Sequence, residues 1–229
     1  MNNILRINKE KALRLFKKAQ LYELGKIADE YRKKLHPEGI VTFVVDRNIN
    51  YTNVCINKCK FCAYYRDIDS QDAFIINKEQ LKQKIQETVN QGGTQILIQG
   101  GLHPDIGIDF YINMFKFIKS HFNINIHGLS PPEICYIADK EGLSIKETLL
   151  ILKNAGIDSI PGGGAEILSD NVRNFISPRK IKTNKWIEVM EQAHKLGIKT
   201  TATMMFGSIE TPEDIIEHLE IIRNLQDKT

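Results

Sequence analysis

Cysteine is scarce in this sequence, and its distribution is uneven. The 229 residues contain four cysteines, and three of them fall within eight positions. A disulfide framework needs cysteines spread in pairs along the chain, so this distribution favours metal or redox chemistry. The chain also lacks an apolar run that could cross a bilayer, and residues 1–19 lack the continuous apolar core of a signal peptide. We therefore expect a cytoplasmic protein with no membrane partner.

An excess of one charge is also lacking. The chain has 31 Lys and Arg against 28 Asp and Glu, a formal net charge of +3, and the two signs are mixed along its length. A nucleic-acid groove requires basic residues gathered on one surface, so no nucleic-acid partner is expected. Hydrophobic residues make up 42% and charged residues 26%, which is typical of one globular domain of this length.

The first forty residues have a helical pattern. Apolar residues recur at helical spacing over residues 9–19 and 21–36, and Pro37 and Gly39 then end the pattern. The sequence predicts an N-terminal helical extension at residues 1–40 and a core at 41–229. The core begins with VTFVVDR, a β-branched stretch from Val41 that predicts a strand.

The core alternates strand-like and helix-like segments. Short apolar runs begin at Thr94, Ile124, Asp158 and Ile198, and between them lie amphipathic stretches at 77–92, 109–122, 144–156 and 183–197. This rhythm favours βα units around a parallel sheet, with glycines and polar residues gathered where the strands end. The last segment, 211–229, is helical where the rhythm requires another strand. We therefore predict an α/β barrel that is partial, cut before its last strand.

The stretch RNINYTNVCINKCKFCAYY contains Cys55, Cys59 and Cys62 in the spacing C-x3-C-x2-C. These offsets fit a loop better than one helix face. A structural zinc site needs four ligands, and the remaining cysteine, Cys135, has the apolar neighbours of a buried helical thiol. Three thiolates on a 4Fe-4S cluster leave one iron open. The spacing favours such a cluster, with zinc and an inert thiol loop as the alternatives.

This cysteine loop, with Phe61 before the third cysteine, resembles the signature of radical S-adenosylmethionine (SAM) enzymes. The resemblance implies a full or partial (βα) barrel, a 4Fe-4S cluster on the three cysteines, and SAM bound at the open iron. It also implies that a 5′-deoxyadenosyl radical takes a hydrogen from the substrate. An electron donor such as flavodoxin or ferredoxin is the partner that this chemistry requires.

Within that family, the motifs ILIQGGLHPDIGIDFY, HGLSPPEI, AGIDSIPGGGAEIL and TTATMMFGSIETPEDIIEHL resemble the cyclic dehypoxanthine futalosine synthases of menaquinone biosynthesis. The resemblance implies a cyclase whose small-molecule substrate is dehypoxanthine futalosine. Aminofutalosine synthases and deazaflavin-precursor synthases share the cysteine loop and both glycine turns, and they remain alternatives. A non-catalytic zinc-binding domain is the alternative of another class. Members of these families are longer, so we expect the C-terminal part of the core to be missing.

The resemblance also assigns five cofactor contacts, and each has a structural alternative. Phe61 is expected beside the adenine of SAM, or as a core aromatic residue. Gly100 and Gly101 are expected to bring their backbone close to the SAM amino group, or to end a strand. Ser130 is a candidate SAM or substrate contact, or a helix cap. Glu166 is expected to contact the SAM ribose or amino group, or to favour a helix dipole.

The remaining candidates lie at strand ends. His103 and His127 are the candidate catalytic residues, although a lone histidine is commonly structural. Arg179 is a candidate partner for the SAM carboxylate, or a surface arginine. The segment 204–206, MMF, is expected to pack in the barrel core. The sequence offers no clear cationic partner for a substrate carboxylate.

Overall fold

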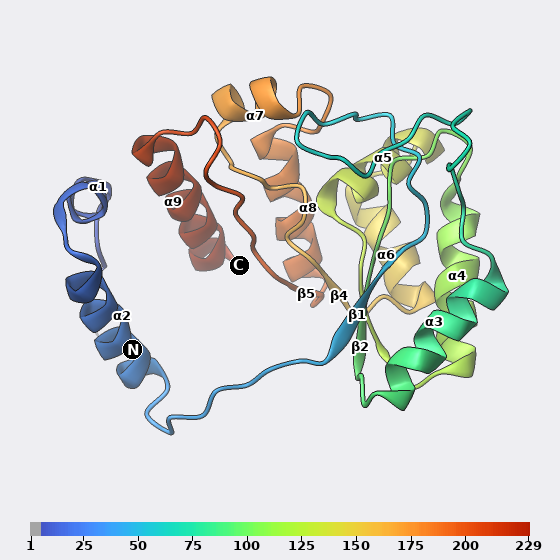
Figure 1. The fold of residues 1–229 in the computed structure, drawn as a ribbon, viewed down its shortest axis with the longest axis horizontal. Helices are drawn as coiled ribbons and strands as arrows, with labels where there is room; N and C mark the ends of the chain where they lie inside the picture. The colour runs from blue at the N-terminus through green and yellow to red at the C-terminus, as the bar shows by residue number, and fades with distance from the viewer. Residues whose placement is uncertain (1–5) are drawn as a thin grey trace.

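Five parallel strands form one sheet in the computed structural model, which describes residues 6–229 (Figure 1). The strands are β1 (Asp46–Asn50), β2 (Gln95–Gln99), β3 (Asn125–Gly128), β4 (Ser159–Ile160) and β5 (Lys199–Thr200). They are neighbours in chain order, and helices connect them. The predicted α/β fold with a parallel sheet is therefore confirmed. The first five residues of the predicted N-terminal extension lie outside the described residues.

The helices of the core follow the predicted rhythm with two additions. They are α3 (Lys78–Asn90), α4 (Ile108–His121), α5 (Pro131–Glu141), α6 (Ile145–Ala155), α7 (Asp170–Ile176), α8 (Thr183–Lys195) and α9 (Pro212–Lys228). Only the start of α5, at Pro131, had a signal in the sequence analysis. Helix α7 was not predicted because its seven residues are too few to show helical periodicity.

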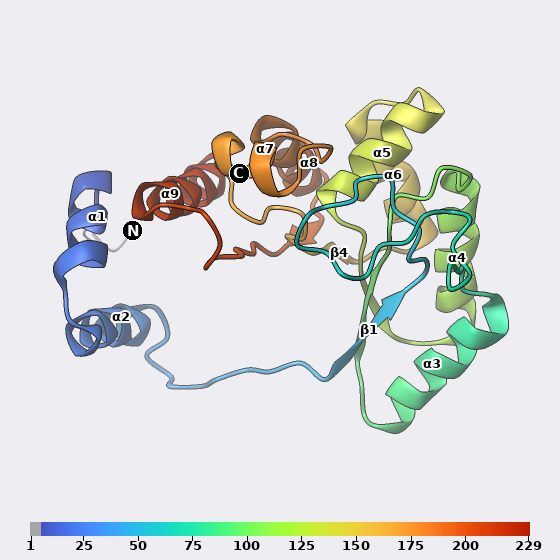
Figure 2. The same cartoon turned by 45° about the horizontal axis from the view of Figure 1, so that its top comes forward.

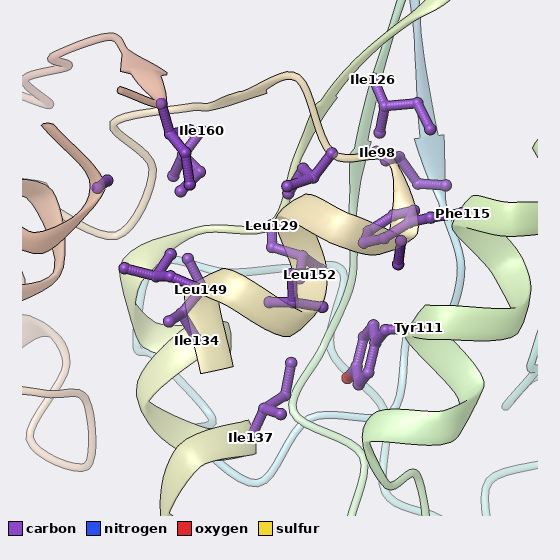
Figure 3. Packing of buried hydrophobic residues seen from close by; sticks show 14 of the residues in the cluster. Ile98, Tyr111, Phe115, Ile126, Leu129, Ile134, Ile137, Leu149, Leu152 and Ile160 are labelled. Carbon is purple, nitrogen blue, oxygen red and sulfur yellow. The ribbon is translucent and has the colours of Figure 1, made fainter. Parts of the chain in front are cut away.

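Alternation along the strands separates two faces of the sheet. In β2, Ile96 and Ile98 are fully buried, whereas the residues between them are partly exposed. Figure 3 shows Ile98 and the neighbouring Ile126 of β3 close to Tyr111 and Phe115 of α4. Successive strand residues point to opposite faces, so the apolar residues face the helices and the residues between them face the inside of the barrel. The hydrophobic core therefore lies outside the sheet, under the helices.

The predicted strand at Val41 is wrong over most of its length, because β1 begins only at Asp46. Residues 41–45 are extended and exposed, and Phe43 exposes 89% of its surface. In the part of the chain that the structure describes, no strand pairs with residues 41–44; Val45 alone accepts a bond from the Thr94 amide. β-Branched residues favour an extended backbone, but a strand also requires a neighbour.

Helix α1 (Lys9–Lys18) lies beside α9, α2 (Leu21–Leu35) follows it, and a long extended segment connects α2 to β1 (Figures 1 and 2). Neither helix has a buried residue. Arg223 of α9 donates to the backbone oxygen of Ile7 over 2.6 Å, and Lys17 forms an ion pair with Glu213. We propose the same division as before, into an extension at 1–40 and a core from residue 41.

The outer edge of β5 has no strand partner within residues 6–229. A groove of about 480 Å³ follows this edge, between α8 and α9, with Trp186, Met190 and Leu225 in its wall. An unpaired edge of this kind agrees with the predicted partial barrel. Among the described helices, none is long and apolar enough to span a bilayer.

Candidate functional site

The cysteine segment forms a loop that backbone hydrogen bonds fasten to the sheet. The Cys55 amide donates to Arg66, and the Ile56 amide donates to Leu102 after β2, over 3.2 and 3.1 Å. Residues 55–62 contain no helix, as predicted. The Lys60 amide donates to the last residue of α7, Ile176, over 2.9 Å. The loop is thus tied at one side to β2 and at the other to α7.

All three cysteines line one cavity of about 240 Å³ at the carboxyl ends of the strands. Its wall also contains the predicted cofactor residues Phe61, Gly100, Gly101 and Ser130. Among residues 6–229, no three His, Cys, Asp or Glu side chains are grouped tightly enough to share one metal ion. The three thiols therefore surround a shared space without forming a ready-made site for a single ion.

Cys59 is the most deeply placed of the three clustered thiols, with 6% of its surface exposed. Burial raises the pKa of Cys59, and the nearby Lys180 ammonium offsets only part of this shift. The neutral thiol is therefore favoured until a cationic metal centre binds and stabilises the thiolate. The Lys180 ammonium nitrogen also lies 5.6 Å from the centre of the Phe61 ring. Lys180 therefore belongs to the same cavity wall as Cys59 and Phe61.

The glycine turn after β2 fits closely against the cysteine loop. A side chain at Gly101 would place its Cβ 2.1 Å from the Val54 oxygen, and one at Gly100 would overlap the Tyr51 ring at 2.5 Å. The Gly100 amide donates to Glu133 and the Gly101 amide to Thr52. The carbonyl oxygens of these two glycines accept no hydrogen bond from the described residues, and both glycines line the cavity.

Ser130 lies at the start of α5 and is 7% exposed. Its hydroxyl and its amide both donate to Glu133, in a capping box. Glu133 also accepts from the Tyr51 hydroxyl over 2.8 Å and from the Gly100 amide over 3.0 Å. Burial raises the pKa of Glu133, although these hydrogen bonds partly counteract it. The carboxyl group thus joins the residue that follows β1, the glycine turn and α5 in the wall of the cavity.

Glu166 lies behind the cavity wall, and it is held by two cations. Lys180 donates to one of its oxygens over 2.6 Å. Arg173 approaches the other oxygen only to 3.6 Å, and that oxygen has no hydrogen-bond partner among the residues that the structure describes. Burial lowers the pKa of Lys180, but Glu166 and Cys59 outweigh this effect, so the pKa is raised overall. The side chain from this cluster that lines the cavity is that of Lys180.

Three residues other than glycine have a positive φ among the described residues, and all three border the cysteine cavity or its wall. They are Lys58 in the cysteine loop at 45°, Leu129 beside Ser130 at 56°, and Glu166 at 43°. Such conformations cost of order 1–3 kcal/mol each and tend to gather where a site needs them. Their grouping is a second, independent indication that this region is the functional site.

The candidate histidines do not line this cavity. His103 is 5% exposed, and its Nδ1 accepts from the Asp105 amide. His127 faces the inside of the barrel from β3, and its Nδ1 lies 2.7 Å from the Ser159 hydroxyl. Burial lowers the pKa of both imidazoles. Arg179 is exposed and donates to the Ile56 oxygen, so it supports the cysteine loop from outside.

One packing prediction needs correction, and another is confirmed. Met204 and Met205 are partly buried against a second apolar cluster, but Phe206 exposes 69% of its surface. It lies in a loop after β5, and no element of residues 6–229 covers it. Cys135 is a buried thiol of α5, as predicted, and burial raises its pKa to about 12.

Two residues of the site were missed, Lys180 and Glu133. Lys180 follows Arg179 in the motif SPRK, and only the arginine was considered as a cation. Glu133 comes three residues after Ser130, which is the spacing of a capping box. That spacing indicates its hydrogen bonds to Ser130, but it does not indicate that the Glu133 side chain is buried.

Comparison with known proteins gives a matching family model. The model of the "Radical SAM superfamily" matches residues 49–222, a range that contains every residue of the cavity wall. The chain is 42% identical over 225 residues to the cyclic dehypoxanthine futalosine synthase of Halalkalibacterium halodurans. It is 44% identical over 209 residues to the 5-amino-6-(D-ribitylamino)uracil–L-tyrosine 4-hydroxyphenyl transferase of Archaeoglobus fulgidus.

These matches cover 98% and 91% of this chain, but 61% and 60% of the two relatives. The chain therefore spans about 60% of the length of the curated relatives that it matches. Among solved structures, methylornithine synthase shares the fold with a TM-score of 0.74 at 14% identity. That match covers 97% of this chain and 62% of the solved chain.

Proposed function

This chain belongs to the radical SAM superfamily, and we propose that it is the barrel part of a cyclase that converts dehypoxanthine futalosine to cyclic dehypoxanthine futalosine. The observation that carries the proposal is the cavity in which the three cysteines meet the glycine turn, Ser130 and Lys180. Segments far apart in the sequence converge there, and the cysteine loop, the QGG turn, SPPE and the GGG turn among them belong to motifs that resemble this enzyme family.

The donor set fits a 4Fe-4S cluster. We propose that Cys55, Cys59 and Cys62 hold it, since soft thiolates are the ligands that such clusters take. When bound, the cluster and SAM supply the electron and the adenosyl group for hydrogen abstraction. The free carbonyl oxygens of Gly100 and Gly101 can accept hydrogen bonds from the SAM ammonium. Phe61 offers an apolar ring face in the same wall.

Lys180 and Glu166 are expected to orient SAM by charge. Lys180 lines the cavity as a cation, and an ammonium group there can bind the SAM carboxylate. Glu166 would then act through Lys180, or would reach the cavity once Lys180 turns toward the carboxylate. The Glu166 oxygen that lacks a hydrogen bond makes the second arrangement feasible without breaking a bond at that atom.

A sister reaction on the same scaffold is the second candidate. The similarity to the 5-amino-6-(D-ribitylamino)uracil–L-tyrosine 4-hydroxyphenyl transferase is as high as the similarity to the cyclase, so it supports that transfer reaction equally. The cyclase is favoured by the joint presence of the motifs SPPE, IPGGGAEIL and TTATMMFG. A zinc-binding domain without catalysis is the remaining alternative.

The test is reconstitution of the anaerobic protein with iron and sulfide. Electron paramagnetic resonance (EPR) of the reduced protein should show a cluster signal that changes when SAM is added. With SAM, a flavodoxin or ferredoxin as electron donor and dehypoxanthine futalosine, the cyclic product should form. Product from tyrosine and the ribitylaminouracil instead would favour the sister reaction, and bound zinc without a cluster signal would rule out both.

A further inference from the structure

The inner face of the sheet carries uncharged hydrogen-bonding side chains directly below the cysteine cavity. Asn50 and Gln99 are register partners in β1 and β2, and both line that cavity. Two residues earlier along the strands, Asn48 of β1 is paired with Leu97 of β2, and Leu97 is paired with His127 of β3. His127 is in turn paired with Ser159 of β4. We call the five polar residues of these two levels the polar floor: Asn48, Asn50, Gln99, His127 and Ser159.

Packing does not explain the polar floor. The interiors of (βα) barrels are usually filled with branched apolar side chains, and here such residues lie mainly on the other face, with Leu97 between the floor residues as the exception. Ile49, Ile98 and Ile126, which alternate with the floor residues, are at most 1% exposed under the helices. Asn48 is exposed and the other four floor residues are partly exposed, so a ligand that covers them would have to replace their hydrogen bonds with water, which favours a polar ligand.

Gln99 reaches across the barrel and keeps its amide free. A Cβ added at Gly163, in the turn after β4, would lie 2.6 Å from Gln99 Nε2, so the side chain extends from β2 to that turn. Neither the Gln99 amide nor the Asn48 amide has a hydrogen-bond partner among residues 6–229. Both can therefore donate to a ligand and accept from it.

His127 is held in a fixed orientation at the lower level. Its Nδ1 lies 2.7 Å from the Ser159 hydroxyl, while Nε2 makes no hydrogen bond within the described chain. Burial lowers the pKa of His127, which favours the neutral ring. Two residues along a strand span about 7 Å, so His127 lies roughly one sugar ring below the level of Gln99.

We propose that the polar floor binds the hydroxyl-rich part of the substrate, a pentose ring or a pentitol chain, with Gln99 and His127 as the specificity-determining contacts. Hydroxyl groups both donate and accept, which matches neutral amides and imidazole. A phosphate or carboxylate would require cations, and the five floor residues include none. The inference rests on the proposed function in one respect: it assumes that the substrate is a small molecule that binds inside this barrel.

The experiment measures binding without turnover. Calorimetry on the cluster-loaded protein with SAM and no reductant gives the Kd for dehypoxanthine futalosine and for 5-amino-6-(D-ribitylamino)uracil. We expect Gln99→Met and His127→Phe each to weaken binding of at least one compound about 3- to 10-fold, the effect of one or two lost hydrogen bonds. His127→Gln restores a polar group near Nε2 and should recover most of the affinity.

Gln86→Met is the matched control, because Gln86 is exposed on α3 and its side chain donates to the neighbouring Asn90 of the same helix. It should bind like the unmodified protein. In every variant, circular dichroism and the change in the cluster EPR signal upon SAM addition should be preserved. Loss of that EPR change in Gln99→Met would assign Gln99 to the cofactor and overturn the proposal.

Two further outcomes would also overturn it: unchanged affinity in Gln99→Met and His127→Phe, or no binding of either compound by the unmodified protein. The fate of the proposed function is separate. If neither compound is converted but Gln99→Met weakens binding, the polar floor stands and the proposed reaction fails. If the cyclic product forms while the variants bind normally, the reaction stands and the polar floor fails.

Discussion

Lys180 connects the predicted cluster ligands with the predicted SAM residues. It donates a hydrogen bond to Glu166, lies over the Phe61 ring and lowers the pKa of Cys59, which burial raises. A buried charge is retained only where partners offset its desolvation, and here the partners are themselves parts of the site. The positive charge in the cavity wall thus comes from Lys180, a residue outside the cysteine motif.

The three clustered cysteines and the lone one should differ in iron binding. We predict that Cys59→Ala loses nearly all of its iron after anaerobic reconstitution, because two thiolates cannot retain the cluster. Cys135→Ala is the matched control, since Cys135 is buried in α5 away from the cavity wall. Iron and sulfide assays with the visible absorption spectrum measure both. Equal iron in the two variants would contradict the assignment.

His218 should make the fold sensitive to mild acid. The side chain is 2% exposed, its Nδ1 accepts from the Leu168 amide, and burial next to Arg173 lowers its pKa to about 4. The unfolded chain has a histidine pKa of about 6.5 and so binds an extra proton between these values. Stability contributed by neutral His218 is therefore complete above pH 6.5 and decreases as the pH falls toward 4, by up to roughly 3 kcal/mol.

Urea denaturation from pH 7 to pH 4.5 tests this expectation. His218→Asn keeps an acceptor for Leu168 without a titrating group, and its stability should depend less on pH over this range. His36→Asn, at an exposed position, should follow the unmodified protein. Identical pH profiles for His218→Asn and the unmodified chain would show that another group causes the acid sensitivity.

At the scale of elements, α5 is the helix that the site depends on most directly. Its first turn contains the capping box of Ser130 and Glu133, and the same carboxyl group binds Tyr51 of the cysteine segment and the Gly100 amide. A capping box usually serves its own helix. This one also fixes the glycine turn, so the start of α5 and the end of β2 are held as one unit.

We predict that Glu133→Ala destabilises the fold by about 2–4 kcal/mol, because it leaves several buried donors without an acceptor. The matched control is Glu147→Ala in the exposed capping box of α6, where the loss should be only about 0.5–1 kcal/mol. Urea denaturation gives both values. Similar losses in the two variants would mean that Glu133 acts only as a cap.

At the scale of the whole molecule, the barrel is open on one side. The outer edge of β5 and the extended residues 41–44 have no strand partner in residues 6–229, and α1 packs against α9 near this side (Figures 1 and 2). A closed barrel has no free edges, so the open side is the part of the fold where further polypeptide would pack.

The docking of α1 on α9 should weaken with salt. The contact uses the exposed ion pairs Arg6–Asp227 and Lys17–Glu213, and exposed pairs contribute only about 0–1 kcal/mol each. Raising the salt concentration from about 0.05 M to about 0.5 M screens them. Hydrogen exchange of α1 amides should then become several-fold faster while α6 amides, in the core, exchange unchanged. Equal exchange of α1 at both salt concentrations would indicate that apolar contacts hold it.

Much of the fold was predictable because it follows from local sequence patterns. The helical periodicity of residues 77–92 and 109–122 places α3 and α4 within a residue or two, and the βα rhythm gives the parallel sheet. The prediction of a strand from Val41 was wrong because β propensity does not show whether a neighbouring strand is present to pair with the segment. Helix α7 was not predicted because seven residues make only about two turns, too few for a helical repeat of apolar residues to be recognised.

The sequence by itself determined the fold class, the family and the three clustered cysteines, since spacing and periodicity are properties of the chain alone. Only the tertiary structure decided which other residues meet them. It brought Lys180 and Glu133 into the site and placed Glu166 behind Lys180, and it put His127 in the polar floor below the cavity rather than in its wall. These contacts join residues far apart in sequence, and the parallel register and the packing of strand ends, which no local pattern encodes, bring them together.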